Sequence, residues 1–409
     1  MPPASSPLVD RPTYLNRLWK RRHNGMVKVI QGPRRCGKST LLKLFQMRLQ
    51  DRGVDADHLI SLNLEDRIHA SLLTPDALHD AVMQKVADGG MHYVFIDEVQ
   101  MCPGFERAVD SLILRENIDL YITGSNAFML SGELATLLTG RHMPLEVMPL
   151  SFAEYRSGTA SDGLSVEEDF QLYIHGGSFP ALLKYRHDET YVDDYYQMLQ
   201  NSMIVKDIAI RHQFKKIDLL ERLTRFLASG VGGIISARKI ADTLSSEKED
   251  VSNRTISDYL KALAESYFFL TVPRFDVVGR QLLRGNEKYY LCDPGFRYHL
   301  VAARDRALGH IVENVVYLEL RRRYTTVTVG KTPTAEIDFV AQKGDVIHYY
   351  QVSLSVMDEQ TFEREIRAFD GVPDNYPKFL LTMDRIGAGE NHNGIEQLHL
   401  LDWLLQTPE

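Results

Sequence analysis

The sequence predicts an α/β protein whose N-terminal part is built on a parallel β-sheet. Four short runs are almost continuously apolar, as is typical of strands that are buried on both faces of a sheet. They are residues 26–31, 58–63, 91–97 and 118–124. Helical patterns separate them, over residues 38–52, 75–88 and 104–116. Strands that alternate with helices in this way form a parallel sheet with helices on its faces.

Length, composition and charge limit the classes of protein that the sequence can encode. With 409 residues the chain is too long for one ordinary core, and 44% hydrophobic and 25% charged residues are typical of a soluble globular protein. The 3 cysteines form no CxxC pair, so we expect neither a disulfide framework nor a thiolate zinc site, and we expect a cytoplasmic location. No apolar run approaches the about 20 residues of a membrane helix, so we expect no membrane contact. Because the net charge is −8, any DNA binding must use local basic patches.

The segment between the first predicted strand and the first predicted helix matches the phosphate-binding pattern G-x-x-x-x-G-K-[ST]. Backbone N–H groups of such a loop surround the phosphates of a nucleotide, and the following helix adds its positive N-terminus. Lys38 is expected to reach the β- and γ-phosphates, and the hydroxyl of Ser39 to ligate Mg²⁺. The predicted binding residues of this loop are Gly32, Pro33, Arg34, Arg35, Cys36, Gly37, Lys38, Ser39 and Thr40. The loop therefore predicts ATP and Mg²⁺ as cofactors.

Polar side chains follow the third and the fourth predicted strand. Asp97 and Glu98 end the third strand; in P-loop ATPases one acid here holds Mg²⁺, and a second acid orients the attacking water and takes its proton. The fourth strand leads to Asn126, which is placed to sense the γ-phosphate. Thr123 and Ser125 are alternatives for that role, and Ser125 also fits an ordinary helix cap.

Arg141 directly precedes a further predicted strand. An arginine that reaches the nucleotide of a neighbouring subunit would stabilise the charge of the transition state. Position alone also allows an ordinary surface arginine, so both interpretations stay open on chemical grounds.

Five motifs together resemble the bacterial and archaeal AAA-type ATPases with an uncharacterised C-terminal domain, which are similar to the AAA+ and STAND ATPases. In chain order they are "GPRRCGKST", "VFIDEVQ", "ITGSN", "LTGR" with "MPLSFAEY", and "HGGSFPALL". The resemblance implies that Lys38 and Ser39 bind nucleotide and Mg²⁺. It also implies that Asp97 and Glu98 serve metal and water, and that Asn126 is a sensor.

The same resemblance makes Arg141 a candidate arginine finger that acts in trans, because AAA-type proteins form rings such as hexamers. It further implies that Pro180 lies near the adenine, as in STAND-type proteins. A helix-breaking turn at "GGSFP" is the other interpretation, since glycine and proline are the commonest turn residues.

Three capped or amphipathic helical patterns followed by two strands predict a winged-helix module. The helices are expected at 216–230, 236–244 and 252–269, and the two strands with a basic turn within 269–296. If the module binds DNA, its last helix would enter the major groove and its cations would contact phosphates. The predicted contacts are Arg254, Thr255 and Lys261 on the helix, with Arg280 and Arg284 on the wing. Packing or protein contact is the alternative use of this module.

The C-terminal part follows the order α-β-β-β-α-β and resembles the PD-(D/E)xK nuclease fold. In that family acids on the first helix and the second strand bind divalent metals, and an acid-x-lysine follows on the third strand. Glu313 and Asp338 match the two acids, but Gln351 and Ser353 stand where the second acid and the lysine are expected.

Arg364 on the next helix would substitute for the missing cation, although an arginine cannot act as a base. Glu336 is expected to be only an exposed, alternate-facing residue of its strand. The domain is therefore interpreted as a degenerate scaffold, with an active nuclease and an unrelated α/β fold as alternatives.

Together these patterns predict an α/β chain of four domains. They are a P-loop ATPase domain at 1–150, a helical lid at 151–213, a winged helix at 214–300 and a restriction-endonuclease-like α/β domain at 301–409. The predicted function is an ATPase that remodels or translocates DNA as a ring-shaped homo-oligomer. A STAND-like switch acting through protein partners and an ATP-dependent DNA nuclease are the alternatives.

Overall fold

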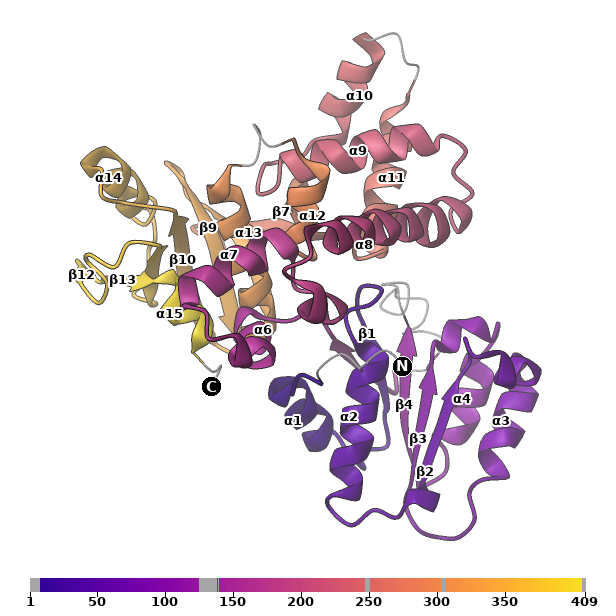
Figure 1. The fold of residues 1–409 in the computed structure, drawn as a ribbon. Helices are drawn as coiled ribbons and strands as arrows, with labels where there is room; N and C mark the ends of the chain where they lie inside the picture. Colours follow the sequence, from indigo (N-terminus) through magenta and orange to yellow (C-terminus); the bar gives the residue numbers. More distant parts are fainter. Residues whose placement is uncertain (1–7, 125–137, 139, 247–250, 303–306, 407–409) are drawn as a thin grey trace. The chain divides into compact units, whose positions relative to one another are not determined.

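The structure is a computed structural model that describes residues 8–124, 138, 140–246, 251–302 and 307–406. The chain divides into two compact units, each of which is described by itself. The smaller unit is formed mainly by Leu8–Pro149, and the larger mainly by Leu150–Ala264 and Phe268–Glu409. Both are drawn as ribbons in Figure 1.

The smaller unit contains a five-stranded sheet in which every pairing is parallel. Its strands are β1 (Val27–Gln31), β2 (Leu59–Asn63), β3 (His92–Asp97), β4 (Ile118–Gly124) and β5 (His142–Glu146). They lie side by side in the order β2-β3-β4-β1-β5. The strand β4 is thus inserted between the strand that leads into the phosphate loop and the strand that ends at Asp97.

Helices cover both faces of this sheet (Figure 1). They are α1 (Pro12–Lys20), α2 (Lys38–Gln50), α3 (Pro75–Met83) and α4 (Glu106–Leu112), with short 3-10 turns at Ala56–His58, Arg67–Leu72 and Val99–Met101. Side chains of α1 and α2 form one buried cluster with one face of the sheet, and those of α3 and α4 form another with the opposite face. The strands β1, β3 and β4 are buried along their whole length, which explains why their sequences are almost continuously apolar, whereas the edge strands β2 and β5 are partly exposed.

The larger unit begins with helices. They are α6 (Phe152–Thr159), α7 (Val166–Gly176), α8 (Glu189–Asn201), α9 (Ile217–Ser229), α10 (Ala237–Ser246) and α11 (Asn253–Glu265). Short 3-10 turns lie at Ala160–Asp162 and Pro180–Tyr185, and a π-helix at Ser202–Ile210 continues α8. Ser151 and Ser165 each form a capping box with the glutamate three residues later, which fixes the starts of α6 and α7.

An eight-stranded mixed sheet follows in the larger unit. Its strands are β6 (Phe269–Asp276), β7 (Gln281–Leu291), β8 (Thr326–Lys331), β9 (Glu336–Lys343), β10 (Val346–Ser353), β11 (Lys378–Thr382), β12 (Asn391–His392) and β13 (Ile395–His399). The helices α12 (Gly295–Leu300), α13 (Leu308–Arg323), α14 (Glu359–Arg367) and α15 (Leu400–Leu405) accompany it. The strand order is β12-β13-β11-β10-β9-β8-β6-β7.

The hairpin β6–β7 of the helical module therefore continues the C-terminal sheet, because β6 pairs in parallel with β8. The boundary that the sequence predicts at residue 300 separates two segments that share one sheet. Within the described residues, no helix combines the length and the apolarity that a membrane crossing needs.

Candidate functional site

The phosphate loop connects β1 to α2 at the carboxyl edge of the smaller sheet. Gly32 has a φ of +149°, and a Cβ at this position would lie 1.9 Å from the carbonyl oxygen of Val147. Gly37 is the left-handed residue that precedes α2, with a φ of +98°. Both positions therefore need glycine, since a side chain would clash at the first and strain the backbone at the second.

Lys38 begins α2, and its side chain is buried. Its Nζ donates hydrogen bonds to the carbonyl oxygens of Gly32 and Pro33, both at 3.0 Å. The ammonium group is thus held over the loop itself. Among the described residues no side chain caps α2, so the first N–H groups of this helix can donate hydrogen bonds to a phosphate group. These features fit a nucleotide phosphate.

A buried arginine that the sequence analysis missed supports the loop from the N-terminal side. Arg11 donates hydrogen bonds to the carbonyl oxygens of Cys36 at 3.2 Å and of Met148 at 2.8 Å. The guanidinium thereby ties the segment before α1 to the phosphate loop and to the end of the sheet. Cys36 is fully buried in the core formed with α1 and α2, so it serves the loop through its backbone.

Asp97 lies at the end of β3, and its carboxylate accepts a hydrogen bond from the hydroxyl of Thr123 on the adjacent strand β4. The same hydroxyl accepts a hydrogen bond of 2.9 Å from the backbone N–H of Glu98. Thr123 is fully buried, and only 8% of Asp97 is exposed. The threonine therefore orients both acidic residues.

Glu98 has a left-handed backbone conformation, with a φ of +53°. Such a conformation is strained for a residue other than glycine or asparagine, and strained residues of this kind cluster at functional sites. The side-chain amide of Gln100 donates a hydrogen bond to the Glu98 carboxylate. Gln100 was not singled out by its sequence pattern, because a glutamine two residues after an acid has no distinctive signal.

The loop and the acidic pair lie within electrostatic reach of each other. Burial raises the pKa of the Cys36 thiol; the Lys38 and Arg11 cations oppose this shift, and the Glu98 carboxylate adds to it. Since β1, β4 and β3 are neighbours and parallel, their carboxyl ends meet at one edge, which is where open α/β sheets bind ligands.

Arg141 lies at the other edge of this sheet. It directly precedes β5, whose first residue His142 pairs with Val27 at the amino end of β1. The side chain is exposed, and its charge lowers the pKa of Asp110 on α4 against the larger, raising effect of burial. Arg141 is therefore remote from the phosphate loop of its own sheet. The predicted sensor Asn126 lies outside the described residues.

The predicted adenine contact Pro180 belongs to the larger unit, where it begins a 3-10 turn. The preceding segment is fastened by Asp293, whose carboxylate accepts hydrogen bonds from the backbone N–H and the hydroxyl of Ser178. Tyr196 also donates a hydrogen bond to Asp293. A Cβ on Gly177 would lie 1.6 Å from the Tyr196 oxygen, so this glycine is required by packing.

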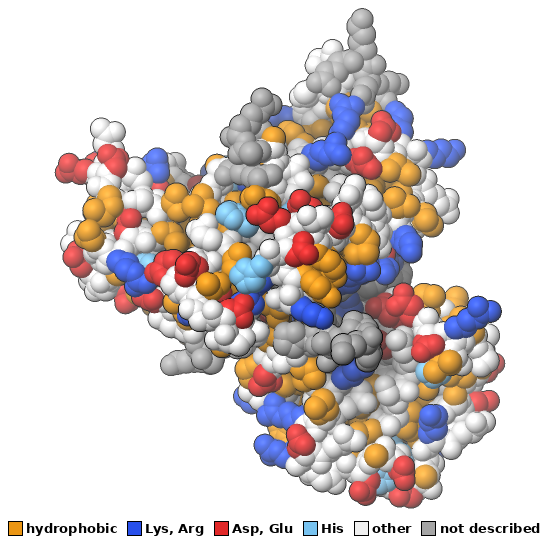
Figure 2. Space-filling model, in the orientation of Figure 1, with side chains coloured by type: hydrophobic (Ala, Val, Ile, Leu, Met, Phe, Trp, Pro, Cys, Tyr) orange, Lys and Arg blue, Asp and Glu red, His pale blue; other side chains and the backbone are white. Residues whose placement is uncertain are grey.

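The predicted DNA-contact residues lie on different parts of the helical module. Arg254 and Lys261 are exposed on α11, and Arg280 is exposed at the turn between β6 and β7. The side chain of Arg284 on β7 lies outside the described part of the structure. Lys261 lines a cavity of about 530 Å³ together with Arg238 of α10. Figure 2 shows further Lys and Arg side chains on the surface over α9 and α10.

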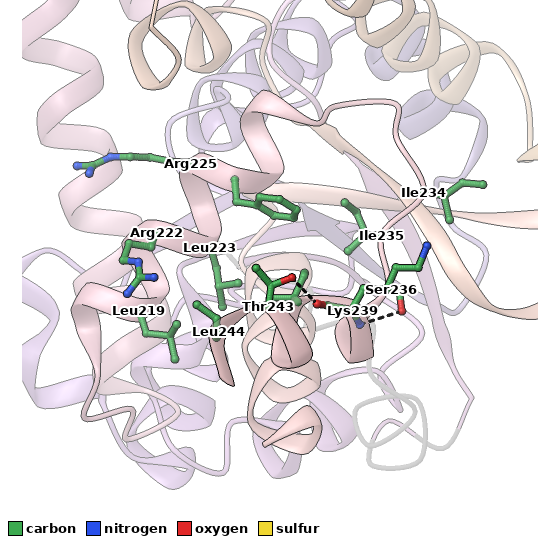
Figure 3. Close-up of a pocket in the computed structure, with 12 residues that line it drawn as sticks. Leu219, Arg222, Leu223, Arg225, Ile234, Ile235, Ser236, Lys239, Thr243 and Leu244 are labelled. Carbon is green, nitrogen blue, oxygen red and sulfur yellow. Dashed lines mark hydrogen bonds between the residues drawn. The ribbon is translucent and has the colours of Figure 1, made fainter. Parts of the chain in front are cut away.

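A second cavity in this module is mainly apolar and measures about 440 Å³ (Figure 3). Its lining comes from α9, from residues 234–236 and from α10. Phe226 is 51% exposed and Ile234 is 46% exposed, so both offer apolar surface at this cavity. The cationic residues of the lining are Arg222, Arg225 and Lys239.

Acidic residues of the helix α13 and of the strand β9 gather around Lys288, a lysine that no local sequence pattern predicts. The Nζ of Lys288 on β7 lies 2.8 Å from Glu336 and 3.4 Å from Glu313, and Tyr290 donates a hydrogen bond of 2.6 Å to Glu313. Glu336 is therefore not merely an outward-facing residue, as its sequence position suggested. Burial would lower the pKa of Lys288, but the carboxylates of Glu313, Asp338 and Glu336 outweigh it and raise that pKa.

Gln351 and Ser353 lie on β10, which pairs with the strand β9 that carries Asp338. The side-chain oxygen of Gln351 accepts a hydrogen bond of 3.2 Å from the Asp338 N–H, and its amide donates one of 2.7 Å to Glu365. The hydroxyl of Ser353 donates to the carbonyl of Ser355. Arg364 pairs with Glu365 at 2.7 Å, so this arginine is engaged with a carboxylate. The two positions of the acid-x-lysine motif thus hold groups committed to internal hydrogen bonds.

The fold and the loop define the class of protein. A phosphate loop after the first strand of a parallel sheet, an acidic pair at the end of β3 and an inserted β4 between them characterise a P-loop NTPase of the AAA type. The family model of the AAA domain matches residues 24–156, and that of a domain of unknown function (DUF8612) matches residues 167–307.

Relatives extend the match over the whole chain. An uncharacterized protein of Haemophilus influenzae is 35% identical over 405 residues, which cover 98% of this chain and 100% of that protein. The chain therefore belongs to the same family as this Haemophilus influenzae protein. An uncharacterized protein of Methanocaldococcus jannaschii is 27% identical over 84% of this chain and 78% of its own length. The Walker-type ATPase of Pyrococcus abyssi is similar in structure, with a TM-score of 0.48 and 16% identity over 71% of this chain and 95% of that one.

Proposed function

We propose that the protein binds and hydrolyses ATP and uses this reaction to act on DNA. The observation that carries the ATPase part is the meeting of Lys38, Asp97 and Glu98 at the carboxyl edge of one parallel sheet. In this arrangement a cation, a metal ligand and a water-orienting acid converge where the phosphates of a nucleotide would lie.

Phosphate binding would open the contacts that now hold Lys38. Its Nζ would exchange the carbonyl oxygens of Gly32 and Pro33 for phosphate oxygens, while the N–H groups at the start of α2 face the same anion. The hydroxyl of Ser39 and the carboxylate of Asp97 would hold Mg²⁺, which neutralises negative charge on the phosphates. Residues 32–40 would form the rest of the cradle through their backbone.

Hydrolysis assigns different tasks to the two acidic residues. Asp97 is shielded and oriented by Thr123, which suits a metal ligand. Glu98 points its carboxylate from a strained backbone position and would orient the attacking water and take its proton. Asn126 keeps the proposed role of a sensor of the γ-phosphate.

The position of Arg141 supports a homo-oligomer. An exposed arginine at the sheet edge opposite the phosphate loop has no route to that loop's own nucleotide, but it can face a neighbouring subunit. A ring would place it near the neighbour's γ-phosphate, where it would stabilise transition-state charge. The proposed protein is therefore a ring, for example a hexamer, in which Arg141 of one subunit acts on the nucleotide of the next.

DNA binding is assigned to the module of α9–α11 with the hairpin β6–β7, acting as a winged helix. Its support is the exposed cation pair Arg254 and Lys261 on α11, with Arg238 across the cavity that Lys261 lines. Cations on the exposed side of a capped helix suit the phosphates of a duplex. Arg280 and Arg284 extend this surface along the hairpin in the proposal. The C-terminal domain would serve as a nuclease-like scaffold without cleavage activity.

The test is ATP turnover by the purified protein with and without duplex and branched DNA. We expect DNA to stimulate turnover, Lys38→Ala to abolish nucleotide binding or turnover, and Glu98→Gln to keep binding but stop hydrolysis.

DNA affinity should fall with salt, and Lys261→Ala should reduce the salt slope by about 1. Lys331→Ala, an exposed lysine elsewhere in the same unit, is the matched control. Absence of both DNA-stimulated turnover and salt-sensitive binding would sink the DNA assignment.

A second candidate function is a nucleotide-dependent switch that acts through a protein partner. The apolar cavity between α9 and α10 favours it, since exposed Phe226 and Ile234 with nearby cations suit an acidic amphipathic helix (Figure 3). Very slow turnover with retained nucleotide, together with binding of an acidic leucine-rich helical peptide that Phe226→Ser weakens, would favour the switch over the motor.

A further inference from the structure

Two histidines and an aspartate meet at the amino edge of the smaller sheet, opposite the edge that carries the phosphate loop. Leu59 of β2 pairs with Tyr93 of β3, so the residues before them, His58 and His92, are neighbours at the starts of two parallel strands. Their rings lie 4.6 Å apart in an edge-on arrangement. Asp88, from the loop after α3, completes the group.

We propose that His58, Asp88 and His92 form a binding site for a divalent ion of the Zn²⁺ class. One ligand atom from each residue can be chosen so that all three lie within 4.8 Å of one another. Two imidazole nitrogens and one carboxylate oxygen are a donor set that zinc and neighbouring transition metals prefer. Tetrahedral coordination with bonds of about 2.0–2.1 Å needs ligand atoms about 3.3 Å apart, so a small closure of the group is required.

The orientation of each side chain fits this use. The Nε2 of His58 is 3.2 Å from both oxygens of Asp88, which is the spacing of two ligands on one ion. The Nδ1 of His92 donates a hydrogen bond of 2.8 Å to the Gly90 carbonyl, and metal-bound histidines have this kind of second hydrogen bond. This hydrogen bond places the proton on Nδ1 of His92, so the lone pair of its Nε2 can bind the metal. That atom now accepts a long hydrogen bond of 3.3 Å from the Ala87 N–H, which coordination would replace.

The loop that carries Asp88 brings its carboxylate close to the two histidines. The N–H of Gly90 donates a hydrogen bond of 2.7 Å to the Asp88 carboxylate and holds it over the histidines. A Cβ on Gly90 would lie 2.9 Å from that carboxylate and 3.2 Å from the His58 ring, so a larger residue would displace both. His92 is fully buried, whereas the Asp88 side chain is 58% exposed, so one side of the site is open to water as a further ligand.

The ion would fasten the loop between α3 and β3 to the start of β2. Since this edge is opposite the phosphate loop, the metal would act on the stability of the sheet, and not on the nucleotide. The inference is independent of the proposed ATPase reaction.

The test measures metal binding by the full-length protein after removal of metal by dialysis against a chelator. We expect calorimetry to show tight uptake of one Zn²⁺ per chain, and Co²⁺ to give the absorption bands of a low-symmetry site. His58→Ala and Asp88→Asn should each weaken binding by about tenfold or more. His79→Ala is the matched control, because His79 is a half-buried histidine beside Asp80 that does not belong to the group.

Two outcomes would overturn the inference. One is the absence of Zn²⁺ and Co²⁺ uptake at micromolar concentration by a protein with a normal circular dichroism spectrum. The other is uptake that His58→Ala and Asp88→Asn leave unchanged. Thermal unfolding with and without Zn²⁺ gives a second readout, since an ion bound only by the folded state must raise the unfolding temperature of the wild type more than that of Asp88→Asn.

Discussion

The ammonium group of Lys288 lies 2.8 Å from the carboxylate of Glu336, which joins the hairpin β6–β7 to the strand β9 of the C-terminal sheet. Only 5% of the Lys288 side chain is exposed, and the same ammonium group also faces Glu313. A single buried cation therefore balances two carboxylates from different elements. The segment that the sequence assigns to a winged helix and the segment that it assigns to a nuclease-like domain meet at this lysine.

Lys288→Met should destabilise the larger unit by about 1–3 kcal/mol, because the change leaves the half-buried carboxylates of Glu313 and Glu336 without a counter-charge. Lys331→Met, which changes an exposed lysine of the same sheet, should have almost no effect. The measurement is the free energy of unfolding from urea titration, followed by circular dichroism.

The double variant Lys288→Met with Glu313→Gln should recover part of that loss, since it removes one of the unpaired charges together with the cation. If the two changes simply add, Lys288 and Glu313 are not coupled, and the loss in Lys288→Met comes from the contact with Glu336 and from packing.

The carboxyl group of Asp338 should make the stability of the larger unit depend on pH. Burial raises its pKa well above the usual range, Glu313 adds to the shift, and Lys288 opposes it. An acid whose pKa is higher in the folded than in the unfolded chain adds stability at low pH, and this contribution is lost as the pH rises through the folded pKa. Asp338→Asn keeps a side-chain oxygen that accepts from the Val352 N–H. Because asparagine does not ionise, the variant does not lose stability as the pH rises.

The variant should therefore be more stable than the wild type at about pH 8, and the difference should shrink towards about pH 5. Urea titrations at the two pH values measure it. A difference that stays constant, or that grows towards low pH, would contradict the raised pKa of Asp338.

The sequence predicted the smaller unit well because its signals are local. The strands β1, β3 and β4 are almost continuous apolar runs, and the phosphate loop at 32–40 has its own sequence pattern, so each could be placed from a few consecutive residues. The α/β fold class, with a parallel P-loop sheet and an additional C-terminal sheet, is confirmed. The roles of individual site residues and the four domain boundaries stay predictions.

The features that escaped prediction depend on partners far apart in the chain. Arg11 donates hydrogen bonds to the carbonyls of Cys36 and Met148, and Lys288 forms an ion pair with Glu336. Neither cation belongs to a local sequence motif. An exposed arginine and a buried one look alike in a sequence, because burial is decided by the fold around them. Period-two alternation likewise could not show that Glu336 would be paired.

Gly177 should be intolerant of any side chain. Its φ of +80° disfavours other residues, and an added Cβ would lie 1.6 Å from the Tyr196 oxygen and 2.6 Å from Asp293. Gly177→Ala should therefore cost about 3 kcal/mol or more, since it combines strain with overpacking in a buried cluster. Thermal unfolding measures the effect.

The neighbouring Gly176→Ala is the matched control, because a Cβ at Gly176 meets nothing within 4 Å. It should be neutral or slightly stabilising, as alanine is favoured over glycine at a helix end with ordinary dihedral angles. Equal unfolding temperatures for the two variants would contradict the packing role of the "GGSFP" segment.

Thr123→Val tests the hydrogen bonds that orient the acidic pair, and it rests on the proposed ATPase activity. Valine keeps the shape and β-branching of the buried threonine but removes the hydroxyl that donates to Asp97 and accepts from the Glu98 N–H. Turnover should fall by about tenfold or more while nucleotide affinity changes little, because phosphate binding depends mainly on Lys38 and the loop backbone. The unfolding free energy should fall by about 1–3 kcal/mol, since the Glu98 N–H loses its partner.

Thr328→Val, at a buried threonine of β8 in the larger unit, controls for the loss of a buried hydroxyl as such. A Thr123→Val protein that turns over ATP at the wild-type rate would mean that Asp97 and Glu98 are oriented without this hydroxyl.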